Sequence, residues 1–277
     1  MVDIHNMSFS YGRKVVYDNF NVTFGKGRIY GLLGLNGSGK STLLYLMSGL
    51  LFPKRGSVTF MGKDVTKRNP AVLSDMFIVP EEFELPRMTL AKYVDINSKF
   101  YPNFSHEMLK KSLDAFSMSL DMNLQASSMG QRKKAFVCFA LATNTSLLLL
   151  DEPTNGLDIP SKSCFRKAVA ECMTDDRTII ISTHQVRDIE YMLDHVLIVD
   201  NDVLLDQSME NISKKLRFEN SSHPTQGAKE IFSMQIGLET HRVVAKEPDQ
   251  EETPVNLEML FNATLANRAE VKSVFNN

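Results

Sequence analysis

The amino-acid sequence predicts an α/β fold built around parallel strands, and three stretches carry this prediction. Residues 28–33 form a short apolar run, which is followed by a glycine-rich loop at 34–42 and then by an apolar helix. Residues 146–152 contain four consecutive leucines before two acids, a pattern typical of a strand buried in a parallel sheet. Residues 177–184 form a second strand of this kind. Because ligands bind at the carboxyl ends of such strands, we expect the functional site there.

The composition is ordinary for a soluble globular protein. Of the 277 residues, 43% are hydrophobic and 23% are charged, and the formal net charge of -2 gives no general attraction to nucleic acid. Residues 1–6 have no basic start or apolar run, so we expect no signal peptide, and no stretch approaches the ~20 apolar residues of a membrane span. Cys138, Cys164 and Cys172 lack metal spacing, which favours reduced thiols in the cytosol. Work at a membrane would need a partner protein.

The loop at 34–42 matches the phosphate-binding pattern G-x-x-x-x-G-K-[ST]. Glycines let successive backbone N–H groups point at one anion, and the following helix adds the partial positive charge of its N-terminus. Lys40 is expected to reach the outer phosphates, and the Ser41 hydroxyl to bind Mg²⁺. A glycine-rich turn before an ordinary helix is the alternative, but the strand–loop–helix context favours a site for a nucleoside triphosphate.

Further strands are predicted on both sides of this loop. Two precede it at 2–9 and 15–24, and two follow it at 57–61 and 76–80. Tyr11 lies in the turn between the first two strands, where we expect partial exposure, and by itself it indicates only a packing role.

A helical insert is predicted next in the chain. Its first helix is broken near Pro102, and a second begins after Ser105, a suitable N-cap. The apolar residues that recur at helical spacing in the first part are Leu90, Val94, Ile96 and Phe100.

The polar stretch 127–131 leads directly into another helix at 132–141. This is a second glycine-containing helix start and therefore a possible second anion site. On its own the pattern is weak, and a simple capped helix start is the favoured interpretation.

Polar residues end the two buried strands. Asp151 is well placed to hold Mg²⁺ through water, and Glu152 to polarise an attacking water. His184 ends the strand at 177–184, on the expected rim of the phosphate site. The alternative, a strand end that merely meets polar loop residues, is disfavoured by the phosphate loop upstream.

The chain after about residue 216 carries no motif with recognisable chemistry. A hairpin around Asn201 precedes it, residues 220–227 resemble a linker, and residues 247–254 are acidic and rich in helix breakers. Short strands at 231–236 and 242–245 are possible. A final helix is expected at 256–266, with Leu257, Leu260, Phe261 and Leu265 facing inward.

Taken together, residues 1–206 resemble the ATP-binding subunit of ABC transporters. Residues 34–42 resemble its Walker A loop, 147–152 its Walker B strand with the catalytic glutamate, 127–131 its signature motif and 155–158 its D-loop. The resemblance implies a P-loop NTPase with a mixed sheet, an antiparallel β-subdomain, a helical insert at about 87–145 and a small C-terminal extension. It divides the chain into an ATPase domain at 1–216 and an extension at 217–277, and it implies an ATPase that uses ATP and Mg²⁺.

The resemblance also assigns site residues. It implies catalytic roles for Glu152, His184 and Lys40, and a metal role for Ser41, Asp151 and Glu81. Tyr11 resembles the aromatic residue that stacks on adenine. The remaining nucleotide-binding residues that it implies are Gly34, Asn36, Gly37, Ser38, Gly39, Lys40, Ser41, Thr42, Ser128, Gly130, Gln131 and Asp158.

Partners follow from the same resemblance. The family works as a head-to-tail dimer, here a homodimer or heterodimer, in which each ATP lies between the Walker A loop of one subunit and the signature of the other. A separate membrane-spanning permease would hold the protein on the inner face of the cell membrane, and no nucleic acid is involved. The short insert, the signature and the lack of a recognisable importer-type regulatory domain resemble exporters.

Two residues depart from the family pattern. Met129 replaces the first of two signature glycines, and Glu81 stands where a loop glutamine is usual. The remaining Gly130 still permits close approach to phosphate, and we hypothesise that Glu81 replaces the glutamine in function.

Three other classes share these motifs. Ribosome-associated relatives usually carry two cassettes, whereas one phosphate loop is present here, and DNA-repair relatives contain a long coiled coil that is missing. An ATPase of iron–sulfur assembly, which has no permease, remains open.

Overall fold

The computed structural model describes residues 1–220, 229–237, 239–247 and 250–275. Its largest sheet has six strands, and its parallel strands place their carboxyl ends on one edge. Only the terminal strand of this sheet pairs in the antiparallel sense. In spatial order the strands are β10 (Val203–Ser208), β9 (His195–Val199), β3 (Ile29–Leu33), β8 (Thr178–Thr183), β7 (Leu147–Asp151) and β6 (Met76–Val79).

The central strands form because nearly every side chain in them is apolar. All residues of β3, β7 and β8 are buried, which requires cover on both faces of the sheet. The predicted parallel core is therefore confirmed, with β8 lying between β3 and β7. This strand order brings the phosphate loop and the acidic pair to neighbouring positions on one edge.

A second, antiparallel sheet covers one face of the first. The apolar side of helix α1 (Lys40–Met47) packs between the two sheets in one buried cluster, which includes Leu43, Leu44 and Met47. The strands, in spatial order, are β2 (Lys14–Phe24), β1 (Val2–Tyr11), β4 (Arg55–Phe60) and β5 (Lys63–Asp64). A short 3₁₀ turn η1 (Val65–Lys67) and helix α2 (Pro70–Leu73) connect this sheet to β6.

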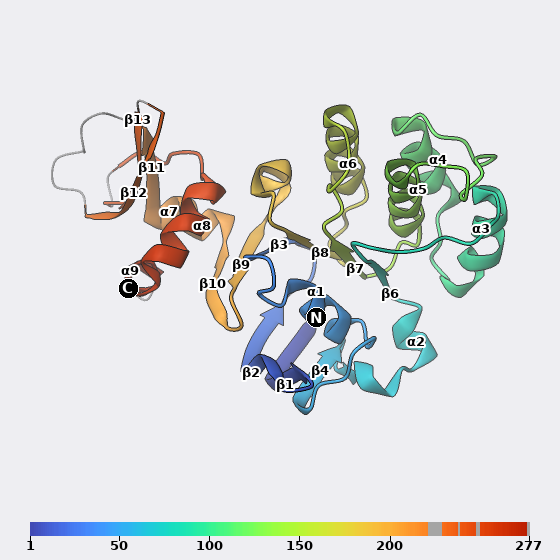
Figure 1. The fold of residues 1–277 in the computed structure, drawn as a ribbon, viewed down its shortest axis with the longest axis horizontal. Helices are drawn as coiled ribbons and strands as arrows, with labels where there is room; N and C mark the ends of the chain where they lie inside the picture. Colours follow the sequence, from blue (N-terminus) through green and yellow to red (C-terminus); the bar gives the residue numbers. More distant parts are fainter. Residues whose placement is uncertain (221–228, 238, 248–249, 276–277) are drawn as a thin grey trace.

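Helices lie beyond β6 at one end of the large sheet (Figure 1). They are α3 (Leu90–Asn97), η2 (Ser98–Phe100), α4 (His106–Ala115) and α5 (Met129–Ala142), and α6 (Ile159–Glu171) follows β7. Ser105 caps α4 as predicted, since its hydroxyl accepts the N–H of Met108 at 3.1 Å. The shared apolar spacing misled at Ile96 and Phe100, which are 42% and 65% exposed. Ile96 lies within α3 but two residues after buried Val94, on the opposite side of the helix, and Phe100 lies in η2, beyond the end of α3 at Asn97.

The C-terminal residues form a smaller unit beside β10, at the opposite end of the sheet (Figure 1). Three strands, in the order β11 (Leu216–Asn220), β13 (Glu239–Ala245) and β12 (Glu230–Ile236), are preceded by α7 (Met209–Lys215) and followed by α8 (Leu257–Ala266) and α9 (Arg268–Phe275).

The sequence predicted β12, β13 and α8, and the structure confirms them, but β11 and α9 were missed. Of the side chains expected to face inward in α8, Leu257 and Leu260 are buried, whereas Phe261 and Leu265 are half-buried. The predicted linker at 220–227 lies, except for Asn220, outside the described residues.

No helix within the described ranges has the length and apolar character needed to cross a bilayer. All three cysteines are free; Cys138 and Cys172 are buried and Cys164 is half-buried. Burial raises the pKa of the Cys138 and Cys172 thiols, which keeps both protonated.

Candidate nucleotide-hydrolysis site

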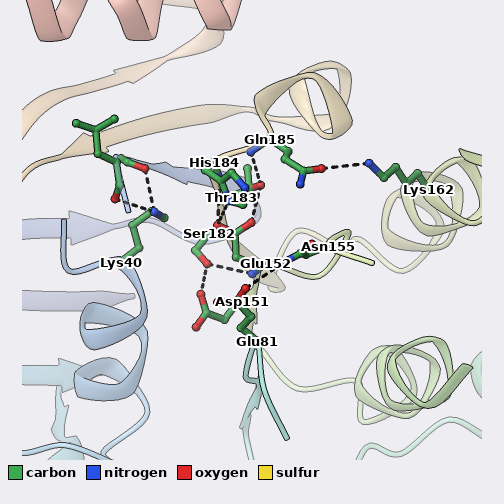
Figure 2. A network of polar contacts seen from close by, with 12 residues as sticks. Lys40, Glu81, Asp151, Glu152, Asn155, Lys162, Ser182, Thr183, His184 and Gln185 are labelled. Carbon is green, nitrogen blue, oxygen red and sulfur yellow. Dashed lines mark hydrogen bonds and ion pairs between the residues drawn. The ribbon is translucent and has the colours of Figure 1, made fainter. Parts of the chain in front are cut away.

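A cleft of about 530 Å³ opens at the carboxyl edge of the large sheet. It lies where the loop after β3, the end of β7 and the end of β8 meet, as the strand order requires (Figure 2). Its size is within the usual range for a small-molecule site. The lining residues are Tyr11, Lys14, Val16, Asn36, Gly37, Gly39, Lys40, Ser41, Thr42, Glu81, Glu152, Asn155 and His184.

The phosphate loop has the backbone that its glycines predict. Gly39 caps α1 with φ of 101°, and a Cβ there would lie 2.6 Å from the hydroxyl of Tyr17. Only glycine avoids both the strain and the clash. Of the predicted loop residues, Gly34 and Ser38 do not line the cleft but lie buried beneath it, where a Cβ on Gly34 would meet Ser38 Oγ at 2.4 Å. These two residues support the loop from below.

Lys40 folds back into its own loop. The residue is 7% exposed, and its ammonium donates to the carbonyls of Gly34 at 2.9 Å and Leu35 at 3.1 Å. Burial lowers the pKa of Lys40, while the carboxylates of Glu152, Asp151 and Glu81 favour the charged form. Lys40 is therefore a buried cation close to three acids, in a position to meet an anion.

Asp151 lies at the end of β7 and is 1% exposed. Its Oδ1 accepts a hydrogen bond from the Ser182 hydroxyl of β8, whereas its Oδ2 is buried with no hydrogen-bond partner among the described residues. A buried carboxylate oxygen normally has a partner. The free oxygen therefore fits a magnesium ion or one of its waters, as the Walker B assignment implies.

Glu152 is held more firmly than any other acid of the cleft. Its carboxylate accepts the N–H of His184 at 3.0 Å, lies 2.7 Å from His184 Nδ1, and accepts the Thr183 hydroxyl at 3.0 Å (Figure 2). Its backbone has φ of 44°, a left-handed conformation that is uncommon for a residue with a side chain. Strained residues of this kind cluster at active sites because their surroundings hold them in place.

Glu81 and Asn155 connect the neighbouring loops. Asn155 Nδ2 donates to Glu81 Oε1 at 3.1 Å, so the carboxylate at the position of the usual glutamine already has a partner (Figure 2). On the other side of the cleft, Tyr11 is 50% exposed as predicted, and its hydroxyl lies 3.4 Å from Thr42 Oγ1. The ring of Tyr11 packs edge-on against Phe9, which fixes its orientation.

The predicted signature residues do not reach this cleft. Ser128, Gly130, Gln131 and Asp158 instead line a second cleft of about 490 Å³. Ser128 caps α5 in a reciprocal box: its hydroxyl accepts the Gln131 N–H at 3.3 Å, and the Gln131 side chain accepts the Ser128 N–H at 3.0 Å. The capped helix start is thus confirmed, although α5 begins at Met129 rather than at 132, and the predicted nucleotide-binding residues lie in two separate clefts.

Sequence reasoning missed several side chains at these sites. Ser182 and Thr183 hold the two acids, and their position just before His184 is the signal that was overlooked. Asn155 was recognised only as part of the turn that resembles the D-loop, and Lys133 lies in a basic run at 132–134. Neither could be found without the tertiary contacts.

A phosphate loop after β3, a buried lysine in that loop and an acidic pair at the end of β7, two strands away in the same sheet, define a P-loop ATPase. A family model described as "ABC transporter" matches residues 17–155, and the chain belongs to this family as an ATP-binding subunit.

Among similar curated proteins, the ABC transporter ATP-binding protein YtrB of Bacillus subtilis is 26% identical over 95% of this chain and 97% of its own length. The lantibiotic transport ATP-binding protein SrtF of Streptococcus pyogenes is 26% identical over 87% of this chain and 100% of its own length. The zinc uptake system ATP-binding protein ZurA of Listeria monocytogenes is 27% identical over 75% of this chain and 86% of its own length. A solved structure, titled "Structure of ATP binding subunit of ABC transporter", has a TM-score of 0.68 and 23% identity, and the match covers 76% of this chain and 91% of that one, which supports the fold.

Proposed function

We propose that this chain hydrolyses ATP with Mg²⁺ in the cleft that Lys40 lines. We further propose that closure of a head-to-tail dimer around ATP drives a membrane transporter. The observation that carries the proposal is the division of the machinery into two clefts, with Lys40, Glu152 and His184 in one and the signature residues in the other. Neither cleft is complete in a single chain. Two copies, or this chain and a related one, would complete each other at both seams.

In this proposal the loop residues Asn36 to Thr42 surround the phosphates with N–H groups, and Lys40 exchanges its two carbonyl contacts for phosphate oxygens. Ser41 and Asp151, with Glu81 nearby, would hold Mg²⁺, which neutralises charge on the β- and γ-phosphates when bound. The unpartnered Oδ2 of Asp151 supports this assignment. Tyr11 would stack on the adenine at the mouth of the cleft.

Glu152 would orient the attacking water and accept its proton, and His184 would hold the Glu152 carboxylate and the γ-phosphate in line. The contacts of Glu152 with His184 and Thr183 support this division of roles. Phosphoryl transfer of this kind depends on positioning and charge neutralisation rather than on a covalent nucleophile. The signature of the second subunit, through Ser128 and the N–H of Gly130, would bind the γ-phosphate from the other side.

We infer export as the direction of transport, and a separate permease that keeps the chain at the inner face of the cell membrane. The exposed Ile96 and Phe100 on the helical insert support a protein partner there, because exposed apolar surface often marks an interface. Purification from detergent-solubilised membranes tests the proposal: recovery of a multi-span protein with this chain is expected. Recovery of the chain alone, free of any membrane protein, would favour an iron–sulfur assembly type.

Glu81 is proposed to replace the usual glutamine in sensing the nucleotide. Its hydrogen bond to Asn155 places it between the acidic loop and the turn after Glu152. Glu81→Ala is expected to reduce both basal and transport-coupled ATP hydrolysis. Unchanged rates in both assays would remove this role.

The extension at 217–277 is proposed to brace the loop after His184. Glu258 of α8 forms an ion pair with Arg187 at 2.6 Å, and Phe261 lies beside His184 and Val186 in a shared pocket of about 320 Å³. Phe261→Ala is expected to lower the rate of ATP hydrolysis more than ATP affinity, since the loop would gain freedom. The matched control is Ile236→Ala in the same extension, an exposed side chain away from this loop; equal effects of both variants would argue against bracing.

A further inference from the structure

Lys133 is a buried cation that none of the roles above uses. It lies in the second turn of α5, it is 4% exposed, and its ammonium donates to the carbonyl of Glu152 at 2.9 Å and to that of Asn155 at 3.2 Å. These two carbonyls begin and end the turn that follows β7. One side chain from α5, the helix that follows the signature residue Ser128, therefore holds the backbone of the proposed catalytic Glu152.

The backbone of Glu152 needs such support because of its conformation. Its φ of 44° is unfavourable for a residue with a Cβ, and strain of this kind persists only where several contacts determine it. The Glu152 N–H donates to the Ser182 carbonyl at 3.0 Å, and its own carbonyl accepts both Lys133 and the Asn155 N–H, the latter at 3.2 Å. Lys133 is the one charged donor in this set, and charge-assisted hydrogen bonds are the stronger ones.

Burying a charged lysine at this position costs free energy of desolvation that an apolar side chain would not. Burial lowers the pKa of Lys133, whereas the nearby carboxylates of Glu81, Glu152 and Asp151 favour its charged form. Taking a charge out of water costs free energy, which only well-placed hydrogen bonds and opposite charges offset. The polar contacts of Lys133 therefore indicate a role in fixing geometry.

We propose that Lys133 is a positioning residue for ATP hydrolysis, which holds the Glu152 main chain and so aims its carboxylate at the water. This inference rests on the proposed function. Because α5 begins at Ser128, in the cleft proposed to receive the partner's nucleotide, Lys133 also ties that helix start to the end of β7 in the same chain. A movement of α5 on closure would thus be transmitted directly to Glu152.

Lys133→Met tests the proposal, because methionine fills similar volume and donates no hydrogen bond. Misplacement of a catalytic group by about 1 Å lowers rates by about 100-fold, so we expect kcat for ATP hydrolysis to fall by about 10- to 100-fold. The dissociation constant for a non-hydrolysable ATP analogue with Mg²⁺, measured by calorimetry, should change by less than about two-fold, because Lys133 does not line the phosphate cleft.

The matched control is Arg177→Met. Arg177 is 2% exposed and donates to three backbone carbonyls, those of Cys172, Ala140 and Leu141, the last two at the far end of α5. Arg177 lies just before β8, so its loss removes a buried cation that contacts the other end of α5 without touching the cleft. The proposal requires kcat of Lys133→Met to fall well below that of Arg177→Met at a temperature where both are folded; equal values would overturn it.

Lys133→Gln keeps a neutral donor and serves if the methionine variant does not fold. Its kcat is expected to lie between the values of the wild type and of Lys133→Met. If the methionine variant cannot be assayed, kcat of Lys133→Gln is expected to be at least about five-fold below that of the wild type. A wild-type kcat in Lys133→Gln would overturn the proposal. Glu152→Gln, assayed in parallel, distinguishes failure of the proposed role of Glu152 from failure of the proposed role of Lys133. If Glu152→Gln hydrolyses ATP at the wild-type rate, the role of Glu152 fails. If Glu152→Gln is inactive while the Lys133 variants remain fully active, only the positioning role of Lys133 is refuted.

Discussion

The substitution Glu152→Gln isolates the charge of one carboxylate. Oε1 of Glu152 contacts the N–H and Nδ1 of His184, and Oε2 accepts the Thr183 hydroxyl. The amide oxygen of glutamine can keep the His184 contacts, and the Thr183 hydroxyl can turn to accept from the new amide. Losing the charge weakens each of these three contacts by about 1 kcal/mol, which is offset in part because a buried carboxylate beside Asp151 is removed.

We therefore expect the free energy of unfolding of Glu152→Gln to change by less than about 2 kcal/mol, or about 4–8 °C in Tm. The effect on catalysis should be much larger. Proton acceptance by a positioned group contributes about 100- to 10,000-fold to a rate, equal to about 3–5 kcal/mol of activation free energy. The variant should bind ATP and dimerise, but it should stall before hydrolysis.

Phosphate release measures turnover, and light scattering after gel filtration with ATP and Mg²⁺ measures the dimer. Glu171→Gln, an exposed acid near the end of α6, provides the control for the loss of a negative charge. Turnover of Glu152→Gln at the parental rate would refute the role of Glu152 as the group that activates water. A variant that binds ATP but stays monomeric would refute dimer closure instead.

Three further predictions concern the loop and the buried lysines. Gly39→Ala should lower the free energy of unfolding by about 2–4 kcal/mol, because φ is 101° and the added Cβ would meet Tyr17 at 2.6 Å; chemical denaturation should show a smaller loss for Gly37→Ala, where the space is open. Lys40→Ala should abolish ATP binding in calorimetry with the fold intact by circular dichroism, and unchanged affinity would contradict its role. Burial lowers the pKa of Lys133 in the folded state. At pH values between this lowered pKa and the ordinary pKa of about 10.4, the unfolded chain therefore binds more protons at Lys133 than the folded chain does. Stability of the wild type should therefore rise relative to Lys133→Met as the pH approaches about 10.4 from below, and parallel changes of stability with pH in the two proteins would contradict this.

The elements around the phosphate loop were predictable because their signals are local. An apolar strand, a glycine-rich turn and a helix follow one another without interruption, so β3 and α1 begin within two residues of the predicted positions. The N-cap at Ser105 was predictable for the same reason, since a cap bonds to a backbone N–H only three residues away. The helix start within 127–131 was also expected, although α5 begins at Met129 rather than at 132.

Patterns failed where packing partners lie elsewhere in the chain. Ile96 and Phe100 were grouped with buried apolar residues but are exposed, because Ile96 lies on the side of α3 opposite Val94 and Phe100 lies beyond the end of that helix. The C-terminal strand β11 was missed because its partner β13 begins after a long intervening stretch, with Leu216 paired to Ala245. Pairing over such distances is invisible to a local window.

By itself, the sequence predicted a triphosphate site at a glycine-rich loop, and it determined that an acidic pair follows a buried strand. Only the tertiary structure decided which side chains meet there. Glu81 contacts Asn155 across 74 positions, and Thr183 contacts Glu152 across 31. Backbone conformation follows from neighbouring residues, whereas a hydrogen bond between distant side chains depends on how strands and helices pack. The strained Glu152 backbone, and the Lys133 that holds it, belong to this second kind.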